Sequence, residues 1–181
     1  MGRKPIIKLG DVFEIPLSDG RKAYGQYVYS DSGGPIMRIF NYFTLPNEKL
    51  DLQAIDTKKL LFPPVYAGIM GAVRAKVWKV IGELPFDDYK FEGFLSEIKE
   101  IGTNKVKRWF FWDGKTSHDL GCSLPKKYVN FENTAVYPAD MIAERIETGF
   151  NMFEYPKKHN RFLTKEEIQK KFPKVKLDDS E

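Results

Sequence analysis

Apolar and polar residues alternate along the N-terminal part of the chain with the two-residue period of a half-buried β-strand. Three such runs follow one another, at residues 9–16, 24–29 and 36–43. Pro16 ends the first run because proline has no N–H to donate to a strand ladder. Turn-forming residues separate the runs at 18–20 and 30–35. The pattern predicts three consecutive antiparallel strands, curled like a small barrel.

The middle of the chain carries weaker periodic signals. Residues 48–60 fit either a short helix or an irregular crossover. Further short strands are predicted at 66–70, 75–84 and 91–98. With the first three runs, these segments predict an antiparallel, strongly bent sheet or partial barrel between residues 6 and 113.

One predicted strand has an unusual content. Residues 105–112 include four consecutive aromatic residues, from Trp109 to Trp112. Successive side chains of a strand point to opposite faces, so two rings lie on each face. Either both faces are covered, or one of them presents its rings to a partner. Asp113 and Gly114 then signal a hairpin turn.

Two helices are predicted near the C-terminus. Residues 138–148 have apolar positions at helical spacing, a proline at the start and a glycine directly after the end. Further on, Thr164 and Glu167 form a capping box, and Pro173 blocks continuation of that helix. The expected fold class is α+β in a single domain of residues 1–181. It comprises a β-rich core at 6–115, a helical part at 138–173 and a tail at 174–181.

Composition and charge narrow the function classes. The 181 residues include 29 basic and 25 acidic side chains, and the net charge of +4 is too small and too scattered to indicate a nucleic-acid-binding face. The single cysteine forms no intrachain disulfide. No apolar run approaches the ~20 residues of a membrane span, so a cytoplasmic protein is expected.

His118 and Cys122 are the strongest candidates for a nucleophile or a metal site. Their spacing of four would align them on a helix, but Gly121 and Pro125 favour a loop. A closed zinc site needs about four ligands, and the only other histidine is His159. We therefore expect no catalytic residue, no metal and no cofactor.

A cluster of carboxylates lies at Glu83, Asp87 and Asp88, with Glu92 nearby. Such acids can perform acid–base chemistry when their environments separate their pKa values. They can also bind a metal ion or a basic partner, or simply line a solvated loop. No phosphate-binding glycine motif accompanies them.

Several short motifs resemble those of the immunity protein 26 family of bacterial polymorphic toxin systems. They are, in order, Gly10-Asp11, Pro16, Asp19-Gly20, Tyr24-Gly25 and the segment 78–82. The resemblance covers roughly residues 6–115. It implies an antidote that is not an enzyme and that binds and blocks one cognate toxin. If the toxin is a basic nuclease, an acidic patch on this mildly basic chain must meet it.

On this interpretation, the partner-binding residues are two rings of the aromatic strand and the acids before it: Trp109, Phe111, Glu83, Asp87 and Asp88. Aromatic anchors supply contact energy, and charges supply steering and specificity. Two alternatives stay open, a small β-barrel that binds nucleic acid and an endoribonuclease-like toxin. Lys105, Lys107 and Arg108 lie beside the rings as stacking on single strands would require.

Overall fold

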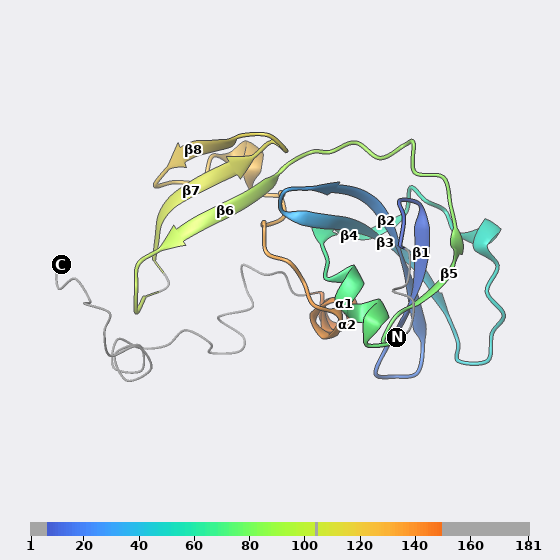
Figure 1. Cartoon of the computed structure of the whole chain (residues 1–181). Helices are drawn as coiled ribbons and strands as arrows, with labels where there is room; N and C mark the ends of the chain where they lie inside the picture. The colour runs from blue at the N-terminus through green and yellow to red at the C-terminus, as the bar shows by residue number, and fades with distance from the viewer. Residues whose placement is uncertain (1–6, 104, 150–181) are drawn as a thin grey trace.

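The computed structural model of the chain describes residues 7–103 and 105–149, which form two antiparallel sheets and two α-helices (Figure 1). The larger sheet has five strands in the order β4-β3-β2-β1-β5, and the smaller has three in the order β6-β7-β8. Both helices lie on one side of the larger sheet. The predicted α+β class with antiparallel, bent strands is confirmed, although the strands divide into two sheets.

The first three strands form the predicted meander. They are β1 (Asp11–Pro16), β2 (Lys22–Asp31) and β3 (Gly34–Thr44). Register shifts interrupt the β2–β3 ladder twice, between Ala23 and Gly25 and between Tyr27 and Tyr29. Such bulges add one residue to one strand and increase its twist, which accounts for the bend of the sheet.

The two edge strands of the larger sheet are β4 (Leu60–Tyr66) and β5 (Lys79–Glu83). The strand predicted at 66–70 is wrong beyond its first residue. Strand β4 ends at Tyr66, and after two residues α1 (Ile69–Arg74) begins. Ile69 and Ala72 are both buried, and their spacing of three is helical, but six residues are too few for the period to be recognised. The ambiguous segment before β4 contains one short 3₁₀ turn, Leu52–Ala54.

The second sheet consists of β6 (Phe94–Lys99), β7 (Val106–Trp112) and β8 (Ser117–Gly121). The loop expected around His118 is wrong, because this segment is strand β8. Gly121, with φ of +83°, ends the strand instead of preventing it. A second 3₁₀ turn, Lys126–Tyr128, follows.

Helix α2 (Ala139–Thr148) matches its prediction closely. Pro138 precedes it, and Gly149 ends it in the left-handed conformation with φ of 71°. Ile142 and Ile146 are buried in the core beneath the larger sheet. The second predicted helix and the predicted tail lie outside the described residues.

Candidate partner-binding site

A connector of residues 84–93 links β5 to β6 and passes over the β2–β3 hairpin (Figure 1). Its aromatic side chains pack on that hairpin, since the rings of Tyr89 and Phe91 lie 6.3 and 5.4 Å from the ring of Tyr29. The start of the connector is fixed by Gln26, whose buried side-chain amide donates to the Leu84 carbonyl oxygen. The connector is therefore attached to the larger sheet at both ends.

Arg38 holds the middle of the connector. This arginine is only 3% exposed, and its Nε donates to Gln26 at 2.9 Å. Its guanidinium donates to both carboxylate oxygens of Asp88, at 3.1 and 3.0 Å, and to the carbonyl oxygen of Pro85. These bonds hold the pKa of Asp88 below its ordinary value. A buried charge is tolerated here because it is paired and hydrogen-bonded.

The acids of the predicted site have different surroundings. Asp87 and Asp88 are both exposed, but the carboxylate of Asp88 is bound by Arg38. Glu83, at the end of β5, forms a surface ion pair with Lys8 at 2.5 Å. An exposed pair of this kind contributes little to stability. Asp87 and Glu83 thus lie at the surface, with Glu83 paired to Lys8, while Asp88 positions the connector.

The aromatic strand β7 is partly open to solvent. Trp109 and Phe111 lie on one face of β7, and both are half-buried. Phe111 contacts the rings of Tyr128 and Phe131, at 4.8 and 5.2 Å between centroids. The aromatic face is therefore neither fully covered nor fully free. The structure places the acids on β5 and the connector, and the rings on the sheet that the connector leads into.

The other face of β7 joins the two sheets at one end. The indole Nε1 of Trp112 donates to Asp31 at 2.8 Å, and the hydroxyl of the fully buried Tyr66 donates to the same carboxylate. Tyr66 also packs on Phe94, with 4.3 Å between ring centroids. Burial, followed by the hydrogen bond to Asp31, raises the pKa of Tyr66. This contact fixes the second sheet against the first.

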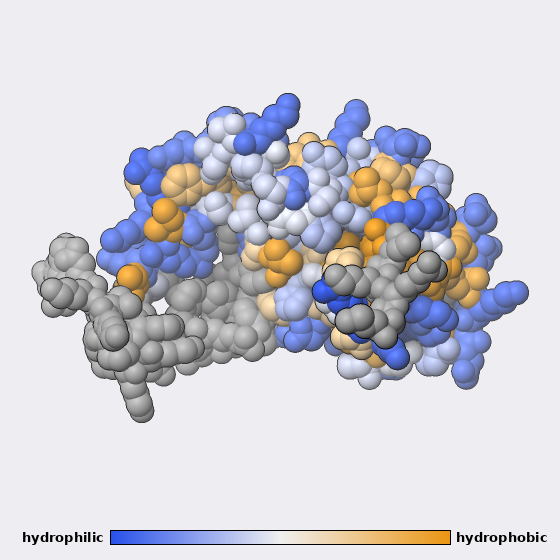
Figure 2. All heavy atoms as spheres, in the orientation of Figure 1, coloured by the Kyte–Doolittle hydropathy of each residue, from blue (hydrophilic) through white to orange (hydrophobic). Residues whose placement is uncertain are grey.

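The far end of this face is exposed. Ile98 on β6 is 52% exposed and Ile101 just after β6 is 55% exposed. Arg108 on β7 pairs with Asp119 on β8 at 2.7 Å in the open. In the space-filling view, hydrophobic residues on the three-stranded sheet form small spots within a mostly hydrophilic surface (Figure 2). Isolated apolar side chains of this kind are ordinary on protein surfaces.

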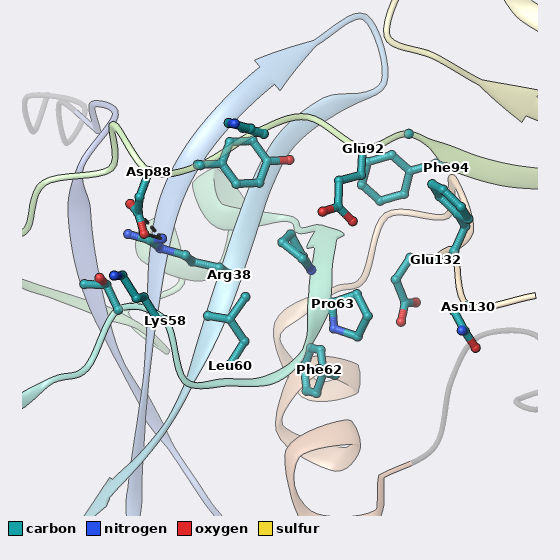
Figure 3. A pocket seen from close by; sticks show the side chains of 16 residues that line it. Arg38, Lys58, Leu60, Phe62, Pro63, Asp88, Glu92, Phe94, Asn130 and Glu132 are labelled. Carbon is teal, nitrogen blue, oxygen red and sulfur yellow. Dashed lines mark hydrogen bonds and ion pairs between the residues drawn. The ribbon is translucent and has the colours of Figure 1, made fainter. Parts of the chain in front are cut away.

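A cavity of about 730 Å³ lies below the connector. Its walls come from three parts of the chain, residues 57–64, 88–94 and 130–132, together with Arg38 (Figure 3). The size falls within the range of about 300–1,000 Å³ that ligand-binding sites occupy. Sequence reasoning missed this cavity, because its walls meet only in the folded chain.

One wall of the cavity is braced from behind by helix α2. Arg145, only 4% exposed, donates to both carboxylate oxygens of Glu132 and to the hydroxyl of Tyr137. Its guanidinium also lies 4.1 Å from the ring centroid of Phe62 on β4. Glu132 is therefore fully neutralised although it lines the cavity.

His118 and Cys122, the remaining candidate residues from the sequence, do not form a common site. The Nε2 of His118 lies 2.6 Å from Oδ2 of Asp113 across the β7–β8 hairpin. This hydrogen bond, together with the backbone N–H groups of Thr116 and Lys115, lowers the pKa of Asp113 to about 2. Cys122 is exposed. Within residues 7–103 and 105–149, no group of three or more histidine, cysteine or acidic residues could hold a metal ion. In the same part of the chain, no helix has the length and apolar content to cross a membrane.

Comparison with known proteins identifies a family. The family model described as Immunity protein 26 matches residues 8–107. The matched region contains β1 to β6 and the beginning of β7. No curated protein and no solved structure matches the chain.

Proposed function

The chain belongs to the immunity protein 26 family, and from this premise we propose that it protects a bacterial cell by binding one cognate toxin and blocking its action. The family match is the observation that carries the proposal. Neutralisation by binding needs a rigid surface rather than a set of reacting groups. The connector, held by Arg38 and Gln26, supplies such a surface.

We place the toxin-binding surface on the connector and the aromatic strand. Trp109 and Phe111 supply partly exposed rings, and aromatic side chains are frequent energetic centres of protein interfaces. Asp87 and Glu83 supply exposed negative charge, which favours association with a basic partner. Asp88 contributes indirectly by fixing the connector to Arg38.

The test is neutralisation of a candidate toxin, sought in the genes adjacent to the gene of this protein. The two proteins are produced together in a sensitive bacterium, and growth and co-purification are measured. We expect growth to be restored and a stable complex to form. Toxicity that persists although the protein is soluble and abundant would contradict the proposal. So would RNA cleavage, or salt-dependent RNA binding, by this protein in the absence of a toxin complex.

The variant Trp109→Ala locates the surface. At an interface anchor, loss of the ring weakens toxin binding by about 2 kcal/mol or more, which is roughly thirtyfold in Kd. Calorimetry of the purified complex measures this change. Leu45→Ala is the matched control, because Leu45 is a 62% exposed apolar residue outside the proposed surface. Equal affinities of the two variants would remove Trp109 from the interface.

A further inference from the structure

The charges that line the cavity are unequally balanced. Asp88 is paired with Arg38, and Glu132 is paired with Arg145. Glu92 also lines the cavity, and within the described residues no ion pair joins it to a cation. Figure 3 shows its carboxylate projecting from the connector into the space opposite Pro63. Of the three carboxylates, only that of Glu92 is left to meet a cation from outside.

The cationic residues of the lining lie elsewhere or are already engaged. Lys58 stands at the opposite end of the cavity, beside the Asp88–Arg38 pair (Figure 3). That end already combines positive and negative charge. Lys90 also lines the cavity, and like Glu92 it is exposed. Because Glu92 is the lining carboxylate without an ion-pair partner, it is the group that complements a positive group from outside.

Aromatic rings also line the cavity. The lining includes Phe62, Tyr89, Phe94 and Phe131, all partly or fully buried. Flat ring faces bind a guanidinium group, which is planar and weakly hydrated. The protein already holds Arg145 in this manner, between a carboxylate and the ring of Phe62. The cavity lining combines the same two kinds of group, the Glu92 carboxylate and aromatic rings, without an arginine between them.

The form of the occupant follows from strand β4. Pro63 and Pro64 lie in this edge strand, and neither has a backbone N–H. An extended segment of a partner cannot form a regular ladder at this point. Entry of a single side chain into the cavity requires no such ladder.

We propose that the cavity receives an arginine side chain of the bound toxin, with Glu92 as its ion-pair partner and the surrounding rings as its walls. This inference rests on the proposed function, because the toxin supplies the arginine. It extends the toxin-binding surface from Asp87 along the connector to Glu92. The Arg38–Asp88 contact and the Arg145–Glu132 contact keep the cavity open before the toxin arrives.

The test uses small probes of the side chain and the full-length protein. Binding of N-acetylarginine amide is followed by NMR through the backbone amides of Gly93 and Phe94. N-acetylcitrulline amide has the same shape without the charge, and N-acetylglutamate amide has the opposite charge. We expect saturable binding of the arginine probe and at least threefold weaker binding of the other two. Glu92→Gln lowers arginine-probe affinity at least threefold.

Asp140→Asn is the matched control, because it removes an exposed carboxylate of α2 that does not line the cavity. It leaves probe binding unchanged. Absence of saturable binding would overturn the inference, as would equal binding of the citrulline probe or an affinity unaffected by Glu92→Gln. Preference for the glutamate probe would overturn it in favour of an anion site at Lys58.

The probes contain no toxin, so the two proposals fail separately. Neutralisation without probe binding removes the arginine pocket and leaves the proposed function in place. Probe binding without neutralisation contradicts the proposed function and removes the toxin as the source of the arginine. Probe binding together with a neutralisation defect in Glu92→Gln supports both.

Discussion

Asp31 joins the two sheets through a single carboxylate. It accepts hydrogen bonds from the Tyr66 hydroxyl, the Trp112 indole and the backbone N–H of Gly33. Tyr66 is fully buried, so its hydroxyl has no easy access to water when this acceptor is removed. Hydrogen bonds to a charged group are stronger than those between neutral groups.

At the scale of single residues, we therefore predict that Asp31→Ala lowers the free energy of unfolding by about 2 kcal/mol or more. Urea denaturation measures this change. Asp19→Ala is the control, since Asp19 forms only an exposed contact with Arg21 and its loss costs at most about 1 kcal/mol. Similar costs for the two substitutions would show that Asp31 is no joint between the sheets.

Single-residue contacts were the least predictable part of the site. The pattern 87–88 indicates two acids, but nothing in the sequence indicates that Asp88 alone meets Arg38, which lies 50 positions away. The same holds for Glu132 and Arg145, because a buried ion pair leaves no periodic pattern in the sequence. The exposed Asp87 was predictable as a charged loop residue, whereas the cavity around Glu92 required the fold.

At the scale of elements, alternation predicted strands well where one face is buried. The first three strands and β7 were recognised because apolar and aromatic residues fill them between turn residues, although the four successive rings of β7 do not alternate with polar residues. Strand β8 was missed because its residues, Ser117–Gly121, are mostly polar and exposed. Strand β8 forms because it pairs with β7, and a local sequence pattern does not reveal which segment will pair with which.

Gly93 controls how the connector enters β6. Its φ is +106°, and a Cβ atom at this position would lie 2.3 Å from Cζ of Phe111 and 2.8 Å from the carbonyl oxygen of Trp112. We predict that Gly93→Ala destabilises the protein by about 3 kcal/mol, from backbone strain and overpacking together. Thermal unfolding followed by circular dichroism gives the measurement.

Gly121→Ala separates the two contributions to that effect. Gly121 has φ of +83°, but no atom lies within 4 Å of the position of its Cβ. Its substitution carries the conformational cost alone, about 1 kcal/mol. A Gly93→Ala variant as stable as Gly121→Ala would show that the connector yields at Phe111, and the rigid-connector account would be wrong.

At the scale of the whole molecule, segment 133–137 links the two sheets a second time. Asn133 forms a bridge to Leu95 in β6, and Tyr137 forms one to Ala67 just after β4. Together with the contact at Asp31, these bridges favour the single folding unit that length alone suggested. The family match ends at the start of β7, inside the smaller sheet, so its boundary does not coincide with a boundary between the two sheets.

We predict one cooperative unfolding transition for both sheets. Trp78 is buried in the larger sheet's core, whereas Trp109 and Trp112 belong to β7. Fluorescence of Trp109→Phe/Trp112→Phe therefore reports on the larger sheet, and that of Trp78→Phe reports on the smaller one. In each variant, we expect the fluorescence midpoint to coincide with that of circular dichroism. Separate midpoints in Trp78→Phe, which keeps the Trp112–Asp31 hydrogen bond, would show two independent units.

The paired prolines of β4 affect how readily the protein aggregates in the cell. An exposed sheet edge is a template on which further copies of a chain can stack and form insoluble fibres. Pro63 and Pro64 lack backbone N–H groups, and because successive N–H groups point to opposite sides of a strand, one of the two removes a donor from the open edge. Copies of the chain can therefore accumulate with less risk of self-assembly at β4. The toxin-neutralising role proposed above needs at least one copy of this protein for each toxin molecule, and this edge favours the abundance that the role requires.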